Sequence, residues 1–188
     1  MESKKNEDIV NAVKQIVSEC TFNKLKIGTM PMFDVEYLFL NIRAKSIGEV
    51  SKLKLLCPDD NKTYANVEVN LEEVQVQVSD DHTNKIELTD SMGMIMTYPT
   101  IDSFAESGIQ QINANNMIDI IGSCVLQIYE DNGEKVYEAK DQTKKEMTEF
   151  IEQMNTTQFK KVQKFFDTMP RLKHTIKVRN PKTKKMND

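Results

Sequence analysis

Apolar residues are most concentrated between residues 33 and 50, where they recur at the spacing of one helix face. Positions i, i+3, i+4 and i+7 of this stretch are apolar, as in an amphipathic helix. Acidic residues in the first turn and basic residues near the end suit the helix dipole. The pattern predicts a helix from about Phe33 to Lys45. Its predicted core positions are Phe33, Val35, Tyr37, Leu38, Phe39 and Ile42.

A second amphipathic stretch precedes this helix. Residues 7–20 carry one apolar face, made of Ile9, Val13, Ile16, Val17 and Cys20. Gly28 and Pro31 interrupt the chain between the two stretches. Two antiparallel helices packed face to face are therefore the predicted nucleus of the fold, with Leu38 and Phe39 buried between them.

Between residues 51 and 98 the spacing changes to the alternation of β-strands. Residues 51–57 and 67–69 alternate apolar and polar side chains on either side of an Asp-Asp-Asn-Lys turn. They predict a hairpin with one solvated face. Residues 74–78 predict a third strand, and residues 85–88 and 94–98 predict two more. The middle of the chain is therefore expected to be antiparallel and rich in β-structure.

Helical spacing returns from residue 101. Ile101, Phe104, Ala105 and Gly108 predict a short helix. A longer helix is predicted from about Asn115 to Tyr129, with Met117, Ile118, Ile121, Val125, Leu126 and Ile128 as its apolar residues. A tight turn at residues 131–133 and a short extended run at residues 135–138 follow.

Two further helices and a strand complete the pattern. Thr143 and Glu146 form the sequence signature of a capping box, which begins one helix. The last helix begins at residues 156–157 and ends at Pro170. Residues 172–178 then alternate as a strand, followed by a turn at residues 180–183. Because no returning strand is predicted after that turn, this strand is expected to leave an open edge.

These elements predict the α+β class: an N-terminal helical pair, an antiparallel β-rich middle and a helical C-terminal half ending in a β-strand. Along the sequence we expect a helical pair plus β-hairpin region at residues 1–99, a helical region at residues 100–170 and a basic strand and tail at residues 171–188. All three are expected within one compact unit.

Methionine is frequent in this chain, with 11 residues, whereas Trp is absent. Flexible Met side chains suit adaptable contact surfaces, so Met92, Met94 and Met96 are candidate partner-binding residues. The Met content is also compatible with an AT-rich genome and with Met side chains that fill gaps in the core. The 3 Cys residues have no metal-ligand spacing and indicate a reduced, cytosolic protein. The sequence has neither a signal-peptide pattern nor an apolar run of membrane-spanning length.

Charge is unevenly distributed. Residues 57–106 hold eleven acidic and two basic residues, whereas residues 159–188 hold ten basic and two acidic ones. Charge that is separated in this way usually belongs to solvated faces of the protein. It can also steer partners of opposite charge or let copies of the chain associate. Our hypothesis is that Lys173, Lys177 and Arg179 lie on one stretch of the open edge strand and steer a partner to it.

No residue pattern points to catalysis. The chain has no Gly-rich phosphate loop and no HExxH motif, and its two His residues lie outside any nucleophile motif. His82 and His174 are predicted to be solvated, and the Asp pairs at residues 59–60 and 80–81 are predicted to be turns. We therefore expect a protein that is not an enzyme and uses no cofactor.

The sequences of several segments are similar to those of a known protein family. Six segments occur in the same order as in members of that family. They are the helix ending at Cys20, the Met30–Asp34 segment that leads into the apolar helix, that helix itself, and residues 82–89, 93–99 and 165–170. Over residues 9–180 the chain resembles the baseplate hub family of T-even-type contractile-tailed bacteriophages. Some relatives have a second Cys soon after the position of Cys57, which this chain lacks, so no zinc site is carried over. Relatives extend further at both ends, so this chain is expected to be a shortened member, an alternative start product or a fragment.

The resemblance implies a baseplate hub assembly factor that binds hub or tape-measure subunits in the host cytoplasm without catalysis. The alternative is a structural hub subunit that stays in the virion. A third interpretation, a nucleic-acid-binding regulator, rests on the basic C-terminal residues alone. Self-association is compatible with the segregated charge, and no membrane partner is expected.

Overall fold

The structure is a computed structural model that describes residues 2–103 and 116–187, and the side chains of residues 2–7 and 132 are not described. The chain forms two compact units. Unit 1 contains Met1–Val35 and Val78–Pro170, and unit 2 contains Glu36–Gln77 and Arg171–Asp188. The predicted α+β class is confirmed, with N-terminal helices, antiparallel sheets, and C-terminal helices followed by strands.

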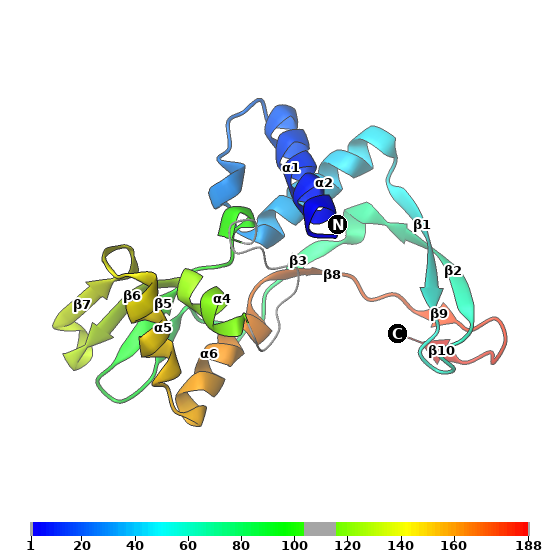
Figure 1. The fold of residues 1–188 in the computed structure, drawn as a ribbon. Helices are drawn as coiled ribbons and strands as arrows, with labels where there is room; N and C mark the ends of the chain where they lie inside the picture. Colours follow the sequence, from blue (N-terminus) through cyan, green and yellow to red (C-terminus); the bar gives the residue numbers. More distant parts are fainter. Residues whose placement is uncertain (1, 104–115, 188) are drawn as a thin grey trace. The chain divides into compact units, whose positions relative to one another are not determined.

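Unit 1 is built around a four-stranded antiparallel sheet with the order β4-β5-β6-β7 (Figure 1). Its strands are β4 (Lys85–Glu87), β5 (Gly93–Met96), β6 (Val125–Glu130) and β7 (Lys135–Glu138). Its C-terminal helices are α4 (Met117–Ser123), α5 (Lys144–Glu152) and α6 (Thr156–Thr168). Short 3₁₀ turns, η3 (Asp131–Gly133) and η4 (Ala139–Asp141), flank β7. The expected short helix at Ile101–Gly108 lies mostly outside the described residues.

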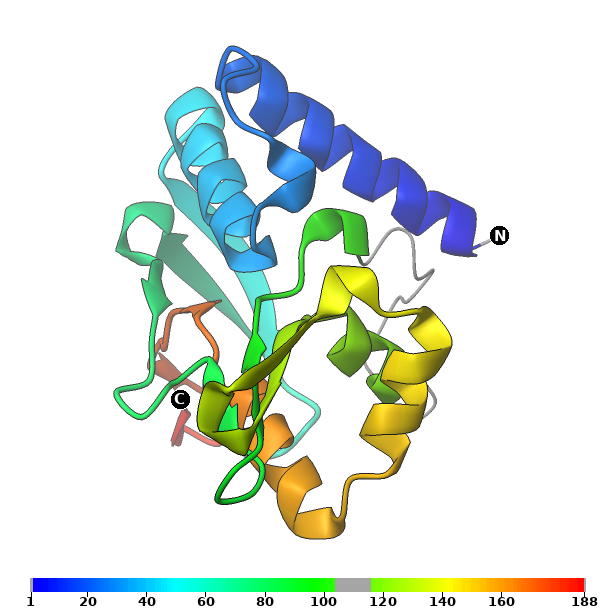
Figure 2. The ribbon, with the colours of Figure 1, turned by 90° about the vertical axis from the view of Figure 1, so that its left-hand side faces the viewer.

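The helices α4, α5 and α6 cover one face of this sheet, which Figure 2 shows from the side of β7. Ile86, Met94 and Ile128 are directly opposite one another on neighbouring strands and turn the same way, toward the helices. The buried cluster that results contains Ile86, Leu88, Met94, Met96, Ile120, Ile121, Cys124, Val125, Ile128, Met147, Ile151, Val162 and Phe165. This core contains no residue of the N-terminal helices, which we had predicted to be the nucleus of the fold.

The predicted long helix at Asn115–Tyr129 is also wrong in its second half. Helix α4 ends at Ser123, and the following residues form β6, which lies between β5 and β7. Both edges of β6 therefore receive backbone hydrogen bonds, whereas a helix at the same residues would leave β5 and β7 without a common partner. Only Gln127 and Glu130 are polar in β6, and apolar side chains lie on both of its faces, so its sequence matches helical spacing as well as strand alternation.

The C-terminal helices begin as their sequences indicate. In α5 the Thr143 hydroxyl accepts the Glu146 N–H, and the Glu146 carboxylate accepts the Thr143 N–H at 2.8 Å. This confirms the predicted capping box. A second one begins α6, where Asn155 and Gln158 exchange the same pair of bonds. Each box satisfies backbone donors that the first helical turn leaves free.

Gly93 in β5 allows a close approach between neighbouring strands. A Cβ atom at Gly93 would lie 2.2 Å from the Tyr129 hydroxyl and 2.5 Å from the Ile86 carbonyl oxygen. The ring of Tyr129 on β6 therefore occupies the space that a side chain at Gly93 would need. Lys85 also lies over this ring, with its ammonium 5.3 Å from the ring centroid.

The two N-terminal helices form where the spacing predicts them: α1 is Glu2–Cys20 and α2 is Met32–Ile47, with the 3₁₀ turn η1 (Ile27–Thr29) between them. Their burial differs from the prediction. Val17 and Val35 are buried, but Ile9, Ile16 and Cys20 are exposed. Leu38 and Phe39, which we predicted to be buried between the two helices, are only partly buried. Residues 37–40 are all apolar and point in four directions around α2, so one packing partner cannot cover them all.

Unit 2 contains the rest of α2 and three two-stranded antiparallel sheets. β1 (Val50–Leu56) pairs with β2 (Tyr64–Asn70), β3 (Gln75–Gln77) pairs with β8 (Arg171–Lys173), and β9 (Val178–Arg179) pairs with β10 (Met186–Asn187); η2 (Leu71–Glu73) joins β2 to β3. The predicted hairpin is confirmed. The single strand predicted at residues 172–178 is wrong: it is divided between β8 and β9. β10 is the return strand that the sequence did not show.

Asn180 follows β9 and connects the C-terminal turn to the β1–β2 turn. Its side chain is fully buried. Its amide donates to Asp59 Oδ1 at 2.8 Å, and its side-chain oxygen accepts the backbone N–H groups of Lys182 and Thr183 at 2.8 and 3.1 Å. Asn187 Oδ1 in turn accepts the Asp59 N–H at 3.2 Å. These bonds hold the end of the chain against the hairpin within unit 2.

Candidate partner-binding surfaces

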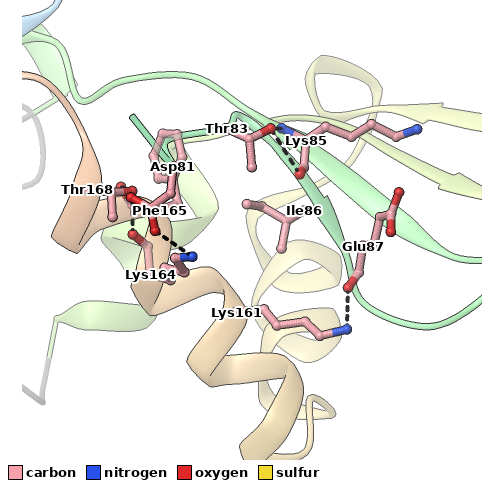
Figure 3. A pocket seen from close by; sticks show the side chains of 9 residues that line it. All are labelled: Asp81, Thr83, Lys85, Ile86, Glu87, Lys161, Lys164, Phe165 and Thr168. Atoms are coloured by element: carbon pink, nitrogen blue, oxygen red, sulfur yellow. Dashed lines mark hydrogen bonds and ion pairs between the residues drawn. The ribbon is translucent and has the colours of Figure 1, made fainter. Parts of the chain in front are cut away.

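A pocket of about 430 Å³ lies in unit 1 beside β4 and α6 (Figure 3). Its floor is apolar and consists of Ile86 and Phe165, which are both buried. Its polar lining comes from Asp81, Thr83, Lys85, Glu87, Lys161, Lys164 and Thr168. The pocket therefore combines an apolar base with a charged rim, as ligand and peptide sites do.

The lysines of α6 make different contacts at this rim. Lys164 forms an ion pair with Asp81, with 2.7 Å between Nζ and Oδ2. The hydrogen bond from Lys164, followed by one from Ser79, lowers the pKa of Asp81 to about 2. Lys161 instead donates to the backbone carbonyl oxygen of Glu87 at 2.7 Å, and the Glu87 carboxylate points away from it (Figure 3). The Lys161 ammonium therefore bonds to a carbonyl oxygen, and no carboxylate takes part in this contact.

His82 lies next to this pocket and is not the solvated loop residue that we predicted. Its ring stacks on Tyr98 and lies 5.2 Å from the ring centroid of Phe165. Nδ1 is 2.9 Å from Thr168 Oγ1, and Nε2 is 3.0 Å from the Tyr98 hydroxyl. Thr168 Oγ1 already donates to the Lys164 carbonyl at 2.8 Å, so it accepts from His82 Nδ1–H. Nε2 then accepts from Tyr98, which is the arrangement of a neutral imidazole.

We expect His82 to make the protein less stable at mildly acidic pH. Burial lowers the pKa of His82 below its usual value of 6.5, with Asp81 opposing the shift. As pH falls through about 6.5, the unfolded chain takes up the proton first, so the folded state loses stability. Thermal unfolding between about pH 7.5 and 5.5 should show this loss. In His82→Gln, which cannot titrate, the melting temperature should change less over the same range; an identical slope would contradict the assignment.

A second candidate surface is the β1–β2 hairpin of unit 2. Several of its large apolar side chains are exposed: Val50 by 54%, Leu53 by 42%, Leu56 by 44% and Tyr64 by 60%. Leu56 lies directly opposite Tyr64, and Leu53 lies opposite Val67 on the other face. Apolar groups are therefore exposed on both faces of the same hairpin. Ile47 and Met186, elsewhere in unit 2, are exposed by 79% and 61%.

The structure separates the residues that we predicted to bind partners. Met94 and Met96 are fully buried in the core of unit 1, so they are inaccessible to a partner, and Met92 is partly buried against that core. Lys173 lies in β8 and pairs with Gln75, whereas Arg179 lies in β9 and pairs with Met186. Lys177 lies between these strands. The three basic residues therefore do not share one open edge strand, and our hypothesis of a common edge is wrong.

The sequence offered little signal for the surfaces that the structure shows. The pocket joins residues 81–87 to residues 161–168, which are distant in sequence. The apolar residues of the hairpin were recognised as strand residues, but their exposure depends on what packs against them. Alternation alone predicted one solvated face, whereas apolar side chains are exposed on both.

The described residues contain no group of three or more His, Cys, Asp and Glu residues that could hold a metal ion. Cys20, Cys57 and Cys124 are free thiols, and burial raises the pKa of Cys124 to about 12. A thiol with so high a pKa is a poor nucleophile at neutral pH. Within the described part of the chain, no helix has the length and apolar character that crossing a membrane requires.

Comparison with known proteins identifies a family. The model of a protein family described as T4 bacteriophage base plate protein matches residues 1–188. No curated protein matches the chain, and no solved structure matches it.

Proposed function

The chain belongs to the family of T4 bacteriophage base plate proteins, and from this premise we propose that it acts as an assembly factor for the central hub of the tail baseplate. It binds a hub or tape-measure subunit in the host cytoplasm and holds it until the subunit's partners dock. The action is binding without catalysis. The family supports a role in the baseplate, and the exposed hairpin of unit 2 supports a role in binding.

The observation that carries this proposal is the exposure of apolar side chains on both faces of the β1–β2 hairpin. An isolated two-stranded hairpin is marginally stable in water. Here Val50, Leu53, Leu56 and Tyr64 are all more than a third exposed on one such hairpin. Exposed apolar groups that gather at one place, as the facing Leu56 and Tyr64 do here, mark sites of association between proteins. A partner that covers the hairpin would remove this surface from water and stabilise the strands.

The same hairpin carries charged residues between its apolar ones. Lys52 and Glu68 lie opposite each other and form an exposed ion pair at 3.3 Å. Interfaces that form and dissociate are about as polar as the rest of a protein surface, whereas permanent interfaces are more apolar. The mixed character of the hairpin therefore supports an assembly factor over a subunit that stays bound.

The hairpin proposal predicts that a charge at its apolar end prevents partner binding. In the double variant Leu56→Lys/Tyr64→Lys, two ammonium groups replace a facing apolar pair, so a bound partner would have to bury unpaired charge. Such burial costs about 3 kcal/mol or more, which corresponds to more than about a hundredfold in affinity. The measurement is the amount of baseplate hub protein that copurifies with the tagged chain from infected cells.

Val136→Lys is the matched control, because Val136 is 51% exposed on β7 in unit 1 and a charge there leaves the hairpin unchanged. It should copurify as much hub protein as the wild type. Circular dichroism of both variants establishes that they are folded. Undiminished capture by the folded hairpin variant would exclude the hairpin as the binding surface.

Mass spectrometry of purified phage particles and of baseplate intermediates tests the assembly role itself. An assembly factor should be present in intermediates and absent from finished particles. A stoichiometric amount in particles would instead establish the alternative, a structural hub subunit. Because this experiment uses no variant, its outcome is independent of which surface of the chain binds.

A further inference from the structure

The outer edge of the unit 1 sheet at β4 faces the pocket beside α6. Asn84 O accepts the Met96 N–H at 2.8 Å, and Leu88 N–H donates to Met92 O at 3.0 Å. The backbone groups of these two residues therefore point toward β5. Because hydrogen-bonding direction alternates along an antiparallel strand, the backbone groups of Lys85 and Glu87 point the other way. Both residues line the pocket.

Side chains occupy the places that a neighbouring strand would take at this edge. The Thr83 hydroxyl accepts the Lys85 N–H at 3.2 Å, and the Lys161 ammonium donates to the Glu87 carbonyl oxygen at 2.7 Å (Figure 3). Exposed lysines at an edge strand restrain pairing with other chains. Lys161 and Thr83 are both exposed and reach the edge with their side chains only, so they can turn away without any change in the backbone.

The pocket beside this edge has the chemistry to hold an extended, acidic segment. Ile86 and Phe165 give it an apolar floor, against which one inward side chain of an added strand can pack. The exposed surface of α6 carries Lys160, Lys161 and Lys164 within its first three turns. Of the three lysines that line the pocket, Lys164 is paired with Asp81, Lys85 lies over the Tyr129 ring, and Lys161 contacts a carbonyl oxygen. An incoming carboxylate would give Lys161 the stronger, charge-assisted partner.

We propose that a partner protein inserts an extended segment rich in Asp or Glu beside β4, as an additional strand of the unit 1 sheet. Its backbone bonds to the outward groups of Lys85 and Glu87, which replaces the contacts from Thr83 and Lys161. One apolar side chain of the segment lies over Ile86 and Phe165, and carboxylates two residues to either side of it, on the same face of the added strand, approach Lys161 and Lys164. Strand addition of this kind takes affinity from the main chain and specificity from alternate side chains. The site lies in unit 1 and does not depend on the hairpin of unit 2.

A direct test uses the capped peptide Thr-Glu-Thr-Val-Thr-Glu-Thr (the Val-Glu peptide), which places Val and both Glu on one strand face, with Thr-Lys-Thr-Val-Thr-Lys-Thr (the Val-Lys peptide) as its charge-reversed control. Each is titrated into the isotope-labelled chain of 188 residues and followed by nuclear magnetic resonance. The Val-Glu peptide should shift the amide signals of residues 85–87 and slow hydrogen exchange at the amides of Lys85 and Glu87. It should bind about tenfold or more tightly than the Val-Lys peptide, because the two α6 lysines of the pocket, Lys161 and Lys164, attract carboxylates and repel ammonium groups.

Substitutions on α6 then distinguish the contribution of the lysine charge from the contribution of backbone pairing at β4. Lys161→Met removes the ammonium but leaves β4 free to pair, so the two peptides should bind with affinities that differ less than about twofold. Lys160→Met, at an exposed neighbouring position that does not line the pocket, should retain the wild-type preference.

Three results would overturn the proposal: no signal change at residues 85–87, equal binding of both peptides to the wild type, or changes that map to β7. Self-association of Lys161→Met without peptide binding would also overturn it, because Lys161 would then only protect the edge. The comparison of the two peptides on the wild-type protein needs no variant, so it remains decisive if a substitution impairs folding.

Discussion

Replacing Phe165 by Ala is expected to lower the free energy of unfolding by about 3–5 kcal/mol, the usual cost of removing a buried aromatic side chain. Phe165 is 1% exposed and lies in the buried cluster between α6 and the sheet. Its ring is 5.7 Å from Tyr98 and 5.2 Å from both His82 and Phe166, measured between ring centroids. The substitution thus leaves a cavity and removes the surface on which the His82 and Tyr98 rings stack.

Urea unfolding followed by far-ultraviolet circular dichroism measures this effect, since the chain has no Trp to report by fluorescence. Phe166→Ala is the matched control, because the neighbouring ring is only partly buried. It should cost about 1–2 kcal/mol, since less apolar surface is removed from the core. Equal losses in the two variants would contradict the position of Phe165 at the centre of the cluster.

Asn180→Asp is expected to release the C-terminal turn from the hairpin at neutral pH. Asn180 is fully buried, and its amide donates to Asp59 at 2.8 Å. This hydrogen bond, followed by one from Thr183, lowers the pKa of Asp59. An aspartate at position 180 retains the acceptor for Lys182 and Thr183 but faces Asp59 with a second carboxylate. Loss of a buried donor costs about 2–3 kcal/mol before any repulsion is counted.

The pH dependence of this variant has the opposite sign to that of the wild type. In the wild type, the lowered pKa of Asp59 gives stability that is present above the usual pKa of 3.8 and is lost as pH falls below it. In Asn180→Asp, the two facing carboxylates raise each other's pKa, so the folded state binds a proton more readily than the unfolded one. The variant should therefore be least stable at neutral pH and regain stability toward about pH 4.

Hydrogen exchange at the Lys184 amide, which donates to the Asn180 carbonyl at 2.9 Å, reports on this turn directly. Asn66→Asp adds the same charge at an exposed position of β2 and serves as the control, with little change in exchange at Lys184. If the Lys184 amide of Asn180→Asp stayed as protected at pH 7 as in the wild type, the contact between Asn180 and Asp59 would not hold the C-terminal turn.

Capping boxes and turns could be predicted because their physical causes lie within a few residues. The bonds between Thr143 and Glu146 span three positions, and both partners are visible in the sequence. The β1–β2 hairpin is equally local, since its strands alternate and a short turn joins them. The second capping box, formed by Asn155 and Gln158, carries a comparable local signal; the prediction did not use it, although it began the helix correctly at residues 156–157.

The helix predicted across residues 125–129 shows where local pattern stops being sufficient. Val125, Leu126 and Ile128 fit a helix face as well as a buried strand. They form a strand because β5 and β7 supply hydrogen-bond partners on both sides, and β5 is about thirty positions away in sequence. The same reason explains the burial of Met94 and Met96. We predicted them to be adaptable surface residues, but they lie on β5, which packs under the helices.

The sequence by itself determined the α+β class, most of the helices and strands and, by resemblance, the baseplate family. Those properties depend on periodicity, caps and short motifs, which neighbouring residues encode. Only the tertiary structure decided that β8 pairs with β3, that Asn180 meets Asp59, and that Lys161 meets the edge of β4. Each of these contacts joins residues more than seventy positions apart. Backbone hydrogen bonds are chemically alike for almost every residue, so the sequence of one strand does not specify which distant strand or side chain will satisfy it.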